Sequence, residues 1–156
     1  MNKKQKSLTN KGFSLVELII VIAIMAVLVG VLAPQFLKYV ERSRKATDVD
    51  NIQSVITAIQ VYAADPAVAS ADKIVASKNA TLTFATGGLT IGGDNSTNVT
   101  KALTEASLTA SNIKMKSEAY KSIVITITVD AEGVPSFSVA NTELATQLGI
   151  KDTTTP

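Results

Sequence analysis

A single carboxylate, Glu17, lies within the most apolar stretch of this sequence. Residues 13–33 read FSLVELIIVIAIMAVLVGVLA, and only Ser14 and Glu17 among these 21 positions are polar. As a helix the stretch would be about 31 Å long, which matches the hydrocarbon core of a bilayer. A lone acid costs roughly 2.5–3.5 kcal/mol at the centre of such a span and less near its end, so Glu17 indicates a function.

Side chains for enzyme chemistry are scarce in the rest of the chain. The sequence has no histidine and no cysteine, which excludes a histidine base, a cysteine nucleophile, a thiolate zinc site and disulfides. The segment 92–98 carries oxygen ligands suited to calcium, but Asp94 is its one charged residue, so we predict no metal site. No nucleophile is paired with a base, and we expect no catalytic residue, no cofactor and no enzyme activity.

The basic residues at the start of the sequence set its formal charge. Residues 1–12 contain four lysines and no acid, and without them 11 basic residues stand against 13 acidic ones, so the net charge changes from +2 to −2. A nucleic-acid-binding function inferred from the overall charge would therefore depend on this segment. The positive-inside rule places residues 1–12 in the cytoplasm.

Two ordinary explanations compete for the apolar run. A secretory signal could be cut after the small-residue pattern Val31-Leu32-Ala33, although Pro34 would then follow the cut and the run is long for a signal. A plain membrane anchor fits the length of the run but does not explain Glu17.

The nine residues from Lys11 to Ile19, KGFSLVELI, closely resemble the class III leader junction of type IV pilins and pseudopilins. The shared features are a short basic leader, Gly12 before the cut, aromatic Phe13 after it, Glu17 four positions further on, and an apolar run that continues to Pro34. The resemblance implies that a prepilin peptidase cuts between Gly12 and Phe13 and that the new Phe13 amine is N-methylated. It also implies that the apolar segment is kept.

Cleavage at this junction would provide a partner for Glu17. A free α-amine on Phe13 can neutralise a carboxylate four residues away or one on a neighbouring chain. The resemblance implies the second arrangement, an assembly salt bridge in which Glu17 of an incoming subunit pairs with Phe13 of the preceding one.

Gly30 and Pro34 predict a kink in the helix. Proline removes a backbone donor and clashes with the carbonyl four residues earlier, and glycine is a poor helix former. A static bend inside a membrane would be one outcome. The resemblance implies instead that the helix between Gly30 and Pro34 loses regular structure in a filament and makes it extensible.

Helical periodicity continues beyond the apolar run. Apolar residues recur at spacings of three and four from Val49 to Ala63, and a helix stop follows at Asp65-Pro66. One helix is therefore predicted from about Phe13 to Ala64. Polar residues on the opposite side of its second half are predicted to face away from the core: Asp48, Asp50, Gln53, Thr57 and Gln60.

The chain beyond the helix predicts short strands and one short helix. Residues 81–86 alternate polar and apolar, and Gly87-Gly88 predicts a turn toward a strand at 89–91. Residues 98–110 predict a short helix whose inward side chains are Val99, Ala102, Leu103 and Ala106.

The clearest strand is predicted at residues 122–129. Its alternate residues Ile123, Ile125, Ile127 and Val129 share one face. A turn at 130–133 returns the chain as a strand at 134–140 with Phe137 and Val139 inward, and Pro135 favours an edge position.

These elements predict an α+β fold, in which a long N-terminal helix packs on a small antiparallel sheet. The helix is predicted to be transmembrane in its first half and amphipathic in its second. Three parts follow: a basic leader (1–12) removed on maturation, a hydrophobic transmembrane and assembly helix (13–34), and a globular head (35–156).

The resemblance implies a structural subunit of a type IV pilus, which polymerises through its N-terminal helix into a filament for adhesion, twitching motility, aggregation or DNA uptake. The implied partners are other pilin subunits, the prepilin peptidase, the pilus assembly machinery and membrane lipid, besides any surface or DNA ligand of the filament. The subunit would be a single-pass protein of the cytoplasmic membrane before assembly and part of an extracellular pilus on a bacterial cell afterwards. The alternatives are a pseudopilin of a type II secretion or competence system and a monomeric membrane-anchored binding protein.

Overall fold

The computed structural model of this protein describes residues 12–76 and 78–154. Most of the predicted leader, residues 1–11, lies outside the described residues. The chain divides into two compact units, Met1–Tyr39 and Val40–Pro156. We refer to the second unit as the head.

Helix α1 runs from Leu15 to Ala64 and crosses the boundary between the two units. The prediction of one helix from about residue 13 to residue 64 is confirmed. The helix continues through Pro34 and ends directly before Asp65-Pro66. Pro66 has no N–H with which to extend the helical hydrogen bonding. The Asp65 side chain accepts a hydrogen bond from Ala67 N (2.7 Å) in the turn that follows.

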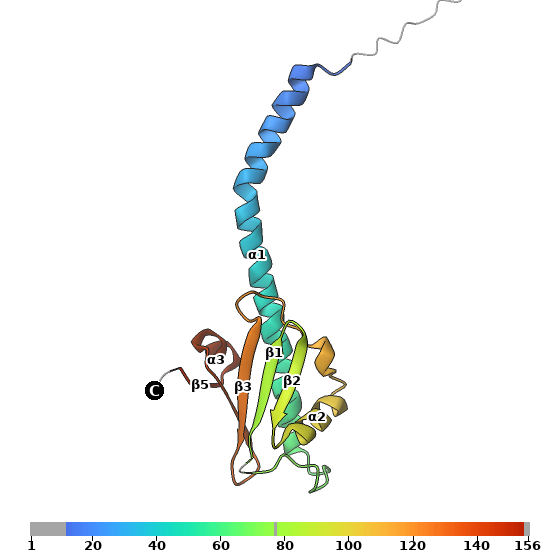
Figure 1. The fold of residues 1–156 in the computed structure, drawn as a ribbon, viewed down its shortest axis with the longest axis vertical. Helices are drawn as coiled ribbons and strands as arrows, with labels where there is room; N and C mark the ends of the chain where they lie inside the picture. The colour runs from blue at the N-terminus through green and yellow to red at the C-terminus, as the bar shows by residue number, and fades with distance from the viewer. Residues whose placement is uncertain (1–11, 77, 155–156) are drawn as a thin grey trace, which may run out of the picture. The chain divides into compact units, whose positions relative to one another are not determined.

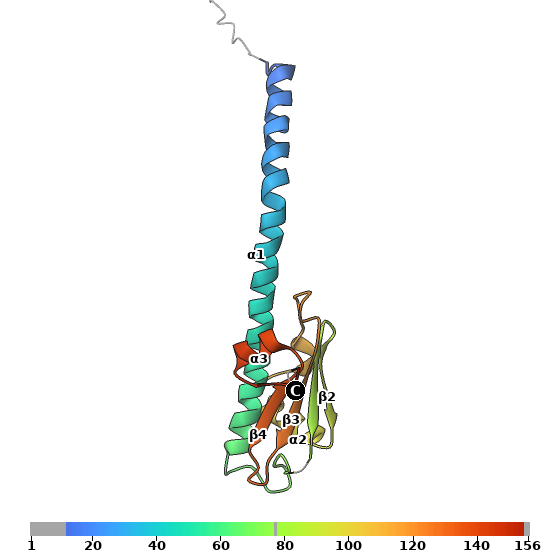
Figure 2. The same ribbon diagram turned by 90° about the vertical axis from the view of Figure 1, so that its left-hand side faces the viewer.

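The head contains one five-stranded sheet (Figures 1 and 2). Its strands are β1 (Ala80–Ala85), β2 (Gly88–Gly93), β3 (Ser122–Val129), β4 (Pro135–Val139) and β5 (Lys151–Asp152), in the order β2-β1-β3-β4-β5. Three of the four pairings are antiparallel, and the short edge strand β5 is parallel to β4. The α+β fold is confirmed, with a sheet that is mixed at this one edge.

Both predicted hairpins are present. Strands β1 and β2 pair so that Ala85 lies opposite Gly88, and only Thr86 and Gly87 connect them. Strands β3 and β4 are joined by the Asp130–Gly133 turn, in which Gly133 adopts a positive φ of 85° and the Asp130 carboxylate accepts hydrogen bonds from two backbone N–H groups. The left-handed conformation explains why glycine is the last residue of this turn.

Strand β4 is not an edge strand as a whole, but Pro135 occupies an edge-like position. Strand β5 pairs with Ser138 and Val139, so no strand among the described residues pairs with the outer side of β4 at Pro135. A residue without an N–H is tolerated there because the ladder does not need that donor.

One face of the sheet packs against the part of α1 in the head. Buried residues of α1 in this core include Ile52, Ile56 and Ile59, which are at most 2% exposed, and those of β3 are the four predicted from alternation. On the opposite face of β3, Val124 is 49% exposed, so the sheet has one packed and one open face.

Helix α2 (Ser96–Glu105) supplies Val99, Ala102 and Leu103 to the same core. The predicted helix at 98–110 is therefore confirmed, with an earlier start and an earlier end. The prediction that Ala106 points inward is wrong, because the helix ends at Glu105 and Ala106 is an exposed C-cap residue. The chain after it turns through Ser107, which has a positive φ of 58°.

Asp48 does not face away from the core as predicted. Its side chain is fully buried, and its two carboxylate oxygens accept hydrogen bonds from Lys116 N and Ser117 N, both at 2.8 Å. Glu41, two helical turns earlier, accepts a hydrogen bond from Glu118 N (2.7 Å). Periodicity could not reveal this role, because the partners of Asp48 are backbone groups 68 and 69 residues further along the chain.

The oxygen-rich segment 92–98 includes a residue with a structural role. Asn95 is buried, and its side-chain amide bonds Val75 N, Val75 O and Lys78 O at 2.9–3.0 Å. Asn95 immediately precedes α2 (Ser96–Glu105), so these hydrogen bonds link the start of α2 to the loop that follows α1.

The C-terminal part of the chain adds α3 (Thr142–Leu148) and β5, which sequence patterns did not reveal. Asn141 caps α3 through a hydrogen bond from Leu144 N to its side chain (2.9 Å), and Gly149 ends the helix in the left-handed conformation. Glu143 forms an ion pair with Lys45 of α1 (3.2 Å).

Candidate assembly and processing site

The first half of α1 presents apolar side chains on all sides. Every described residue from 12 to 39 is exposed, and the large apolar side chains in this range are 50–92% exposed. By length and composition α1 could cross a membrane, and the window that qualifies has none of its residues buried. A face of this size is covered by lipid or by other protein chains in a functional protein.

The helix begins with a reciprocal pair of hydrogen bonds between side chain and backbone. Ser14 precedes the first helical residue, and its hydroxyl oxygen accepts a hydrogen bond from Val16 N (3.3 Å). The Glu17 carboxylate accepts a hydrogen bond from Ser14 N (2.9 Å). This arrangement is a capping box, in which a serine and a glutamate three residues later satisfy free N–H groups of the helix start.

The capping box gives Glu17 a partner in its own chain. A carboxylate in the first helical turn also interacts favourably with the positive end of the helix dipole. Ser14 was not singled out from the sequence, although the pattern Ser-x-x-Glu before an apolar run is a recognised signal for a helix start. The Glu17 carboxylate therefore already has a hydrogen-bond donor in the uncleaved chain.

Gly12 and Phe13 lie just before the helix. Neither residue is helical, Phe13 is 92% exposed, and apart from the adjacent residues no atom of the described chain lies within 4 Å of the position that a Gly12 side chain would occupy. The Gly12–Phe13 peptide bond is therefore accessible and precedes the residues that the capping box holds in helical form. The Phe13 nitrogen is part of this bond and carries no charge here.

Gly30 and Pro34 lie within one uninterrupted helix. Their spacing of four has a consequence, because the helical hydrogen bond to the Gly30 carbonyl would come from the nitrogen of residue 34, and proline has no N–H to donate. The two predicted residues therefore lie at the two ends of one helical hydrogen bond that cannot form.

Similarity to known proteins supports the importance of this N-terminal region. A family model described as the prokaryotic N-terminal methylation motif matches residues 8–33. The chain is also 39% identical over 49 residues to the type IV major pilin protein PilA of Myxococcus xanthus (strain DK1622). That match covers 31% of this chain, which spans about a fifth (22%) of the length of the relative. No solved structure matched the chain.

The chain carries the N-terminal methylation motif and is similar to a type IV major pilin over 49 residues. The methylation motif coincides with the capping box and the exposed apolar half of α1, so the region recognised by similarity is the region that the head does not bury. The head is built on the second half of α1, which lies beyond the matched motif.

Proposed function

We propose that this pilin-type chain is the subunit of a type IV pilus and polymerises through the first half of α1. The observation that carries the proposal is the division of α1 into two parts with different surroundings. Its second half belongs to the core of a folded head, whereas its first half exposes apolar residues on every side. A bundle of such first halves from many subunits would bury them, as a filament core requires.

The organisation of the chain follows from this proposal. Residues 1–12 are the leader removed by a prepilin peptidase between Gly12 and Phe13, residues 13–34 are the membrane and assembly helix, and residues 35–156 form the globular head. Before assembly the subunit spans the cytoplasmic membrane once, and afterwards it lies in a filament on the cell surface. The accessible, non-helical Gly12–Phe13 bond supports cleavage at this point.

In this proposal, Glu17 exchanges one kind of partner for another. In the precursor its carboxylate accepts a hydrogen bond from Ser14 N. Cleavage creates an α-amine on Phe13, which is N-methylated, and a Glu17 carboxylate of the next subunit pairs with this cation. The ion pair sets the axial register of each incoming subunit. The subunit needs two further partners, the prepilin peptidase and the assembly machinery of the membrane.

Intact-mass analysis of the protein from its own cells, together with shearing of the cells, tests the proposal. We expect the mass of a chain that begins at Phe13 with one added methyl group, and we expect this chain in the sheared surface fraction. A chain that retains residues 1–12 and stays in the membrane fraction would contradict the proposal and leave a simple membrane anchor.

A further inference from the structure

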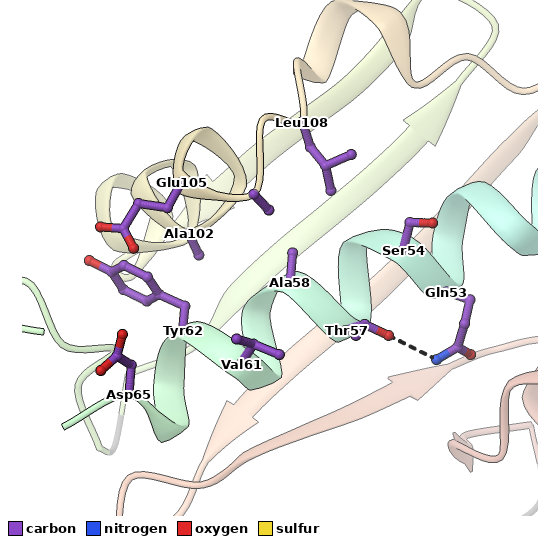
Figure 3. A pocket seen from close by; sticks show the side chains of 11 residues that line it. Gln53, Ser54, Thr57, Ala58, Val61, Tyr62, Asp65, Ala102, Glu105 and Leu108 are labelled. Carbon is purple, nitrogen blue, oxygen red and sulfur yellow. Dashed lines mark hydrogen bonds between the residues drawn. The ribbon is translucent and has the colours of Figure 1, made fainter. Parts of the chain in front are cut away.

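A groove of about 580 Å³ lies on the head between α1 and the end of α2 (Figure 3). The apolar part of its lining comes from both elements: Ala58, Val61, Ala102, Ala106 and Leu108. Val61 is 64% exposed, although the other large apolar residues in the part of α1 within the head are buried or half-buried. The groove therefore offers an apolar surface that nothing in the described residues covers.

One end of this groove is acidic. In Figure 3, Glu105, Tyr62 and Asp65 lie together at the end of the groove away from Gln53. Neither carboxylate forms an ion pair among residues 12–76 and 78–154. Burial raises the pKa of Tyr62, and the negative charges of Glu105 and Asp72 raise it further. A cation at this end of the groove would be attracted by the same charges.

A segment of α1 has the complementary properties. Phe36 and Tyr39 are 66% and 65% exposed, and they lie three residues apart, so they share one side of the helix. Arg42 follows three residues later, is exposed, and forms no ion pair among the described residues. All three lie beyond the apolar run 13–33. In a subunit that leaves the membrane, the two aromatic side chains therefore need another protein surface to pack against.

We propose that the groove binds the Phe36–Arg42 segment of a second copy of this chain. The inference rests on the proposed polymerisation. It adds a contact with the head of a neighbouring subunit to the packing of the first halves of α1. The two aromatic side chains pack on the apolar lining, and Arg42 pairs with Glu105 and Asp65 at the acidic end.

The order of the groups supports parallel packing of the two chains. Subunits drawn from one membrane have the same orientation, so their α1 helices run in the same direction. Along the groove the apolar part precedes the acidic end at Asp65, and along the segment the aromatic residues precede Arg42. The helix from Gln53 to Ala64, just before Asp65, is about 17 Å long and that from Phe36 to Arg42 about 9 Å, so the segment fits within the groove.

A charge exchange tests the ion pair in cells whose filaments contain only this chain. Glu105→Lys and Arg42→Glu each place like charges in contact, so each should lower the sheared filament fraction by about tenfold or more while the membrane level of the subunit stays unchanged. The double variant should restore the sheared fraction to within about twofold of wild type. Asp94→Lys and Lys78→Glu make the same charge changes at exposed positions outside the groove and should leave the yield unchanged.

Normal yields from both single variants would overturn the inference, and so would losses that the double variant does not repair. Cross-linking gives an independent test, because the chain has no cysteine of its own. In sheared filaments of the Tyr39→Cys, Ala106→Cys double variant, a short bifunctional maleimide should link subunits into ladders, and neither single variant should give them. Filaments that form without such ladders contradict the groove contact, whereas a wild type that forms no filament contradicts the proposed function.

Discussion

Glu17 accepts a hydrogen bond from a backbone N–H of its own chain before any neighbouring subunit is present. This bond lowers the cost of placing an acid in an apolar segment, because the carboxylate completes the helix start. It does not remove the negative charge. The cap and the charge of Glu17 are therefore separate properties that substitutions can distinguish.

The first prediction separates these two properties. Glu17→Gln keeps an acceptor of the capping-box type and removes the charge, whereas Glu17→Leu removes both. If pairing with the Phe13 amine drives assembly, both variants leave an unpaired ammonium in the filament, at a cost of roughly 3–5 kcal/mol per contact. We expect both to reach the membrane normally and to give almost no sheared filament in cells without wild-type subunits.

Ser14→Ala is the matched variant, because it removes the serine half of the cap and keeps the charge. Loss of this cap costs about 1 kcal/mol, so filaments should still form. Normal filament yield from Glu17→Gln would show that the cap, and not the ion pair, is what Glu17 provides.

Gly12 carries the second prediction. Replacing it with valine places a branched side chain beside the scissile bond, and we expect the leader to stay attached and filaments to be lost. The free space around Gly12 means that this substitution does not disturb the folded chain itself. Blotting for precursor and mature forms measures the effect, and mature protein beginning at Phe13 in this variant would refute the assigned cleavage site.

At the scale of elements, two acidic residues of α1 hold the segment that leads into β3. Asp48 and Glu41 together accept hydrogen bonds from Lys116 N, Ser117 N and Glu118 N. Asp48 is fully buried, so its own two hydrogen bonds are at least partly shielded from water, whereas the bond to Glu41 is exposed.

The third prediction is that Asp48→Ala strongly destabilises the head. The substitution leaves the buried Ser117 N–H and the partly buried Lys116 N–H without their acceptor, which costs roughly 2–5 kcal/mol. Urea unfolding of the chain in detergent, followed by circular dichroism, should show this loss. Asp50→Ala, an exposed neighbour on the same helix, should change the unfolding free energy by less than about 0.5 kcal/mol.

Tyr120 carries the fourth prediction. Its side chain is buried, and its hydroxyl makes no hydrogen bond among the described residues. Burial raises the pKa of Tyr120, and the negative charge of Glu143 raises it further. The unfolded chain therefore loses this proton at a lower pH than the folded chain does, so stability is unaffected below about pH 10 and falls as the pH rises above it.

Tyr120→Phe should remove this part of the alkaline destabilisation. At neutral pH it should leave stability unchanged or raise it by about 1 kcal/mol, because it removes an unpaired buried hydroxyl. Unfolding free energies at pH 7 and pH 11 measure both effects. A clear loss of stability at pH 7 would mean that the hydroxyl has a partner after all.

Local patterns predicted the elements that have strong periodicity. The bounds and the buried face of strand β3 follow from the sequence because Ile or Val recurs at every second position from 123 to 129. Helix α3 and strand β5 were not predicted, because seven and two residues are too short to show a period. The end of α2 was placed too late because no proline or glycine marks it.

Contacts between distant segments lie beyond such patterns. Asp48 resembles any other polar residue on the outer side of an amphipathic helix until the segment 116–118 is placed beside it. The candidate residues Gly12, Phe13 and Glu17 could be named from the sequence because they form one short motif. The capping partner of Glu17 was also local, and its signal was present in the sequence.

At the scale of the whole molecule, the division of α1 leads to the fifth prediction. A fragment beginning at Gln35 lacks the apolar run and keeps every buried residue of the head core. We expect it to be a soluble, folded monomer, since it keeps only four of the exposed large apolar side chains of α1, namely Phe36, Leu37, Tyr39 and Val61. Sedimentation and circular dichroism measure this, and aggregation or loss of structure would show that the division is misplaced.

The attachment of Asp48 and Glu41 also determines how a pulled subunit would transmit load. Tension applied through the first half of α1 enters the head along the helix backbone. It meets these two carboxylates before it reaches the buried isoleucines, and their hydrogen bonds connect it to residues 116–118, just before the central strand β3. The head is thus held close to a strand that is paired on both sides, and not at an edge strand that is paired on one side.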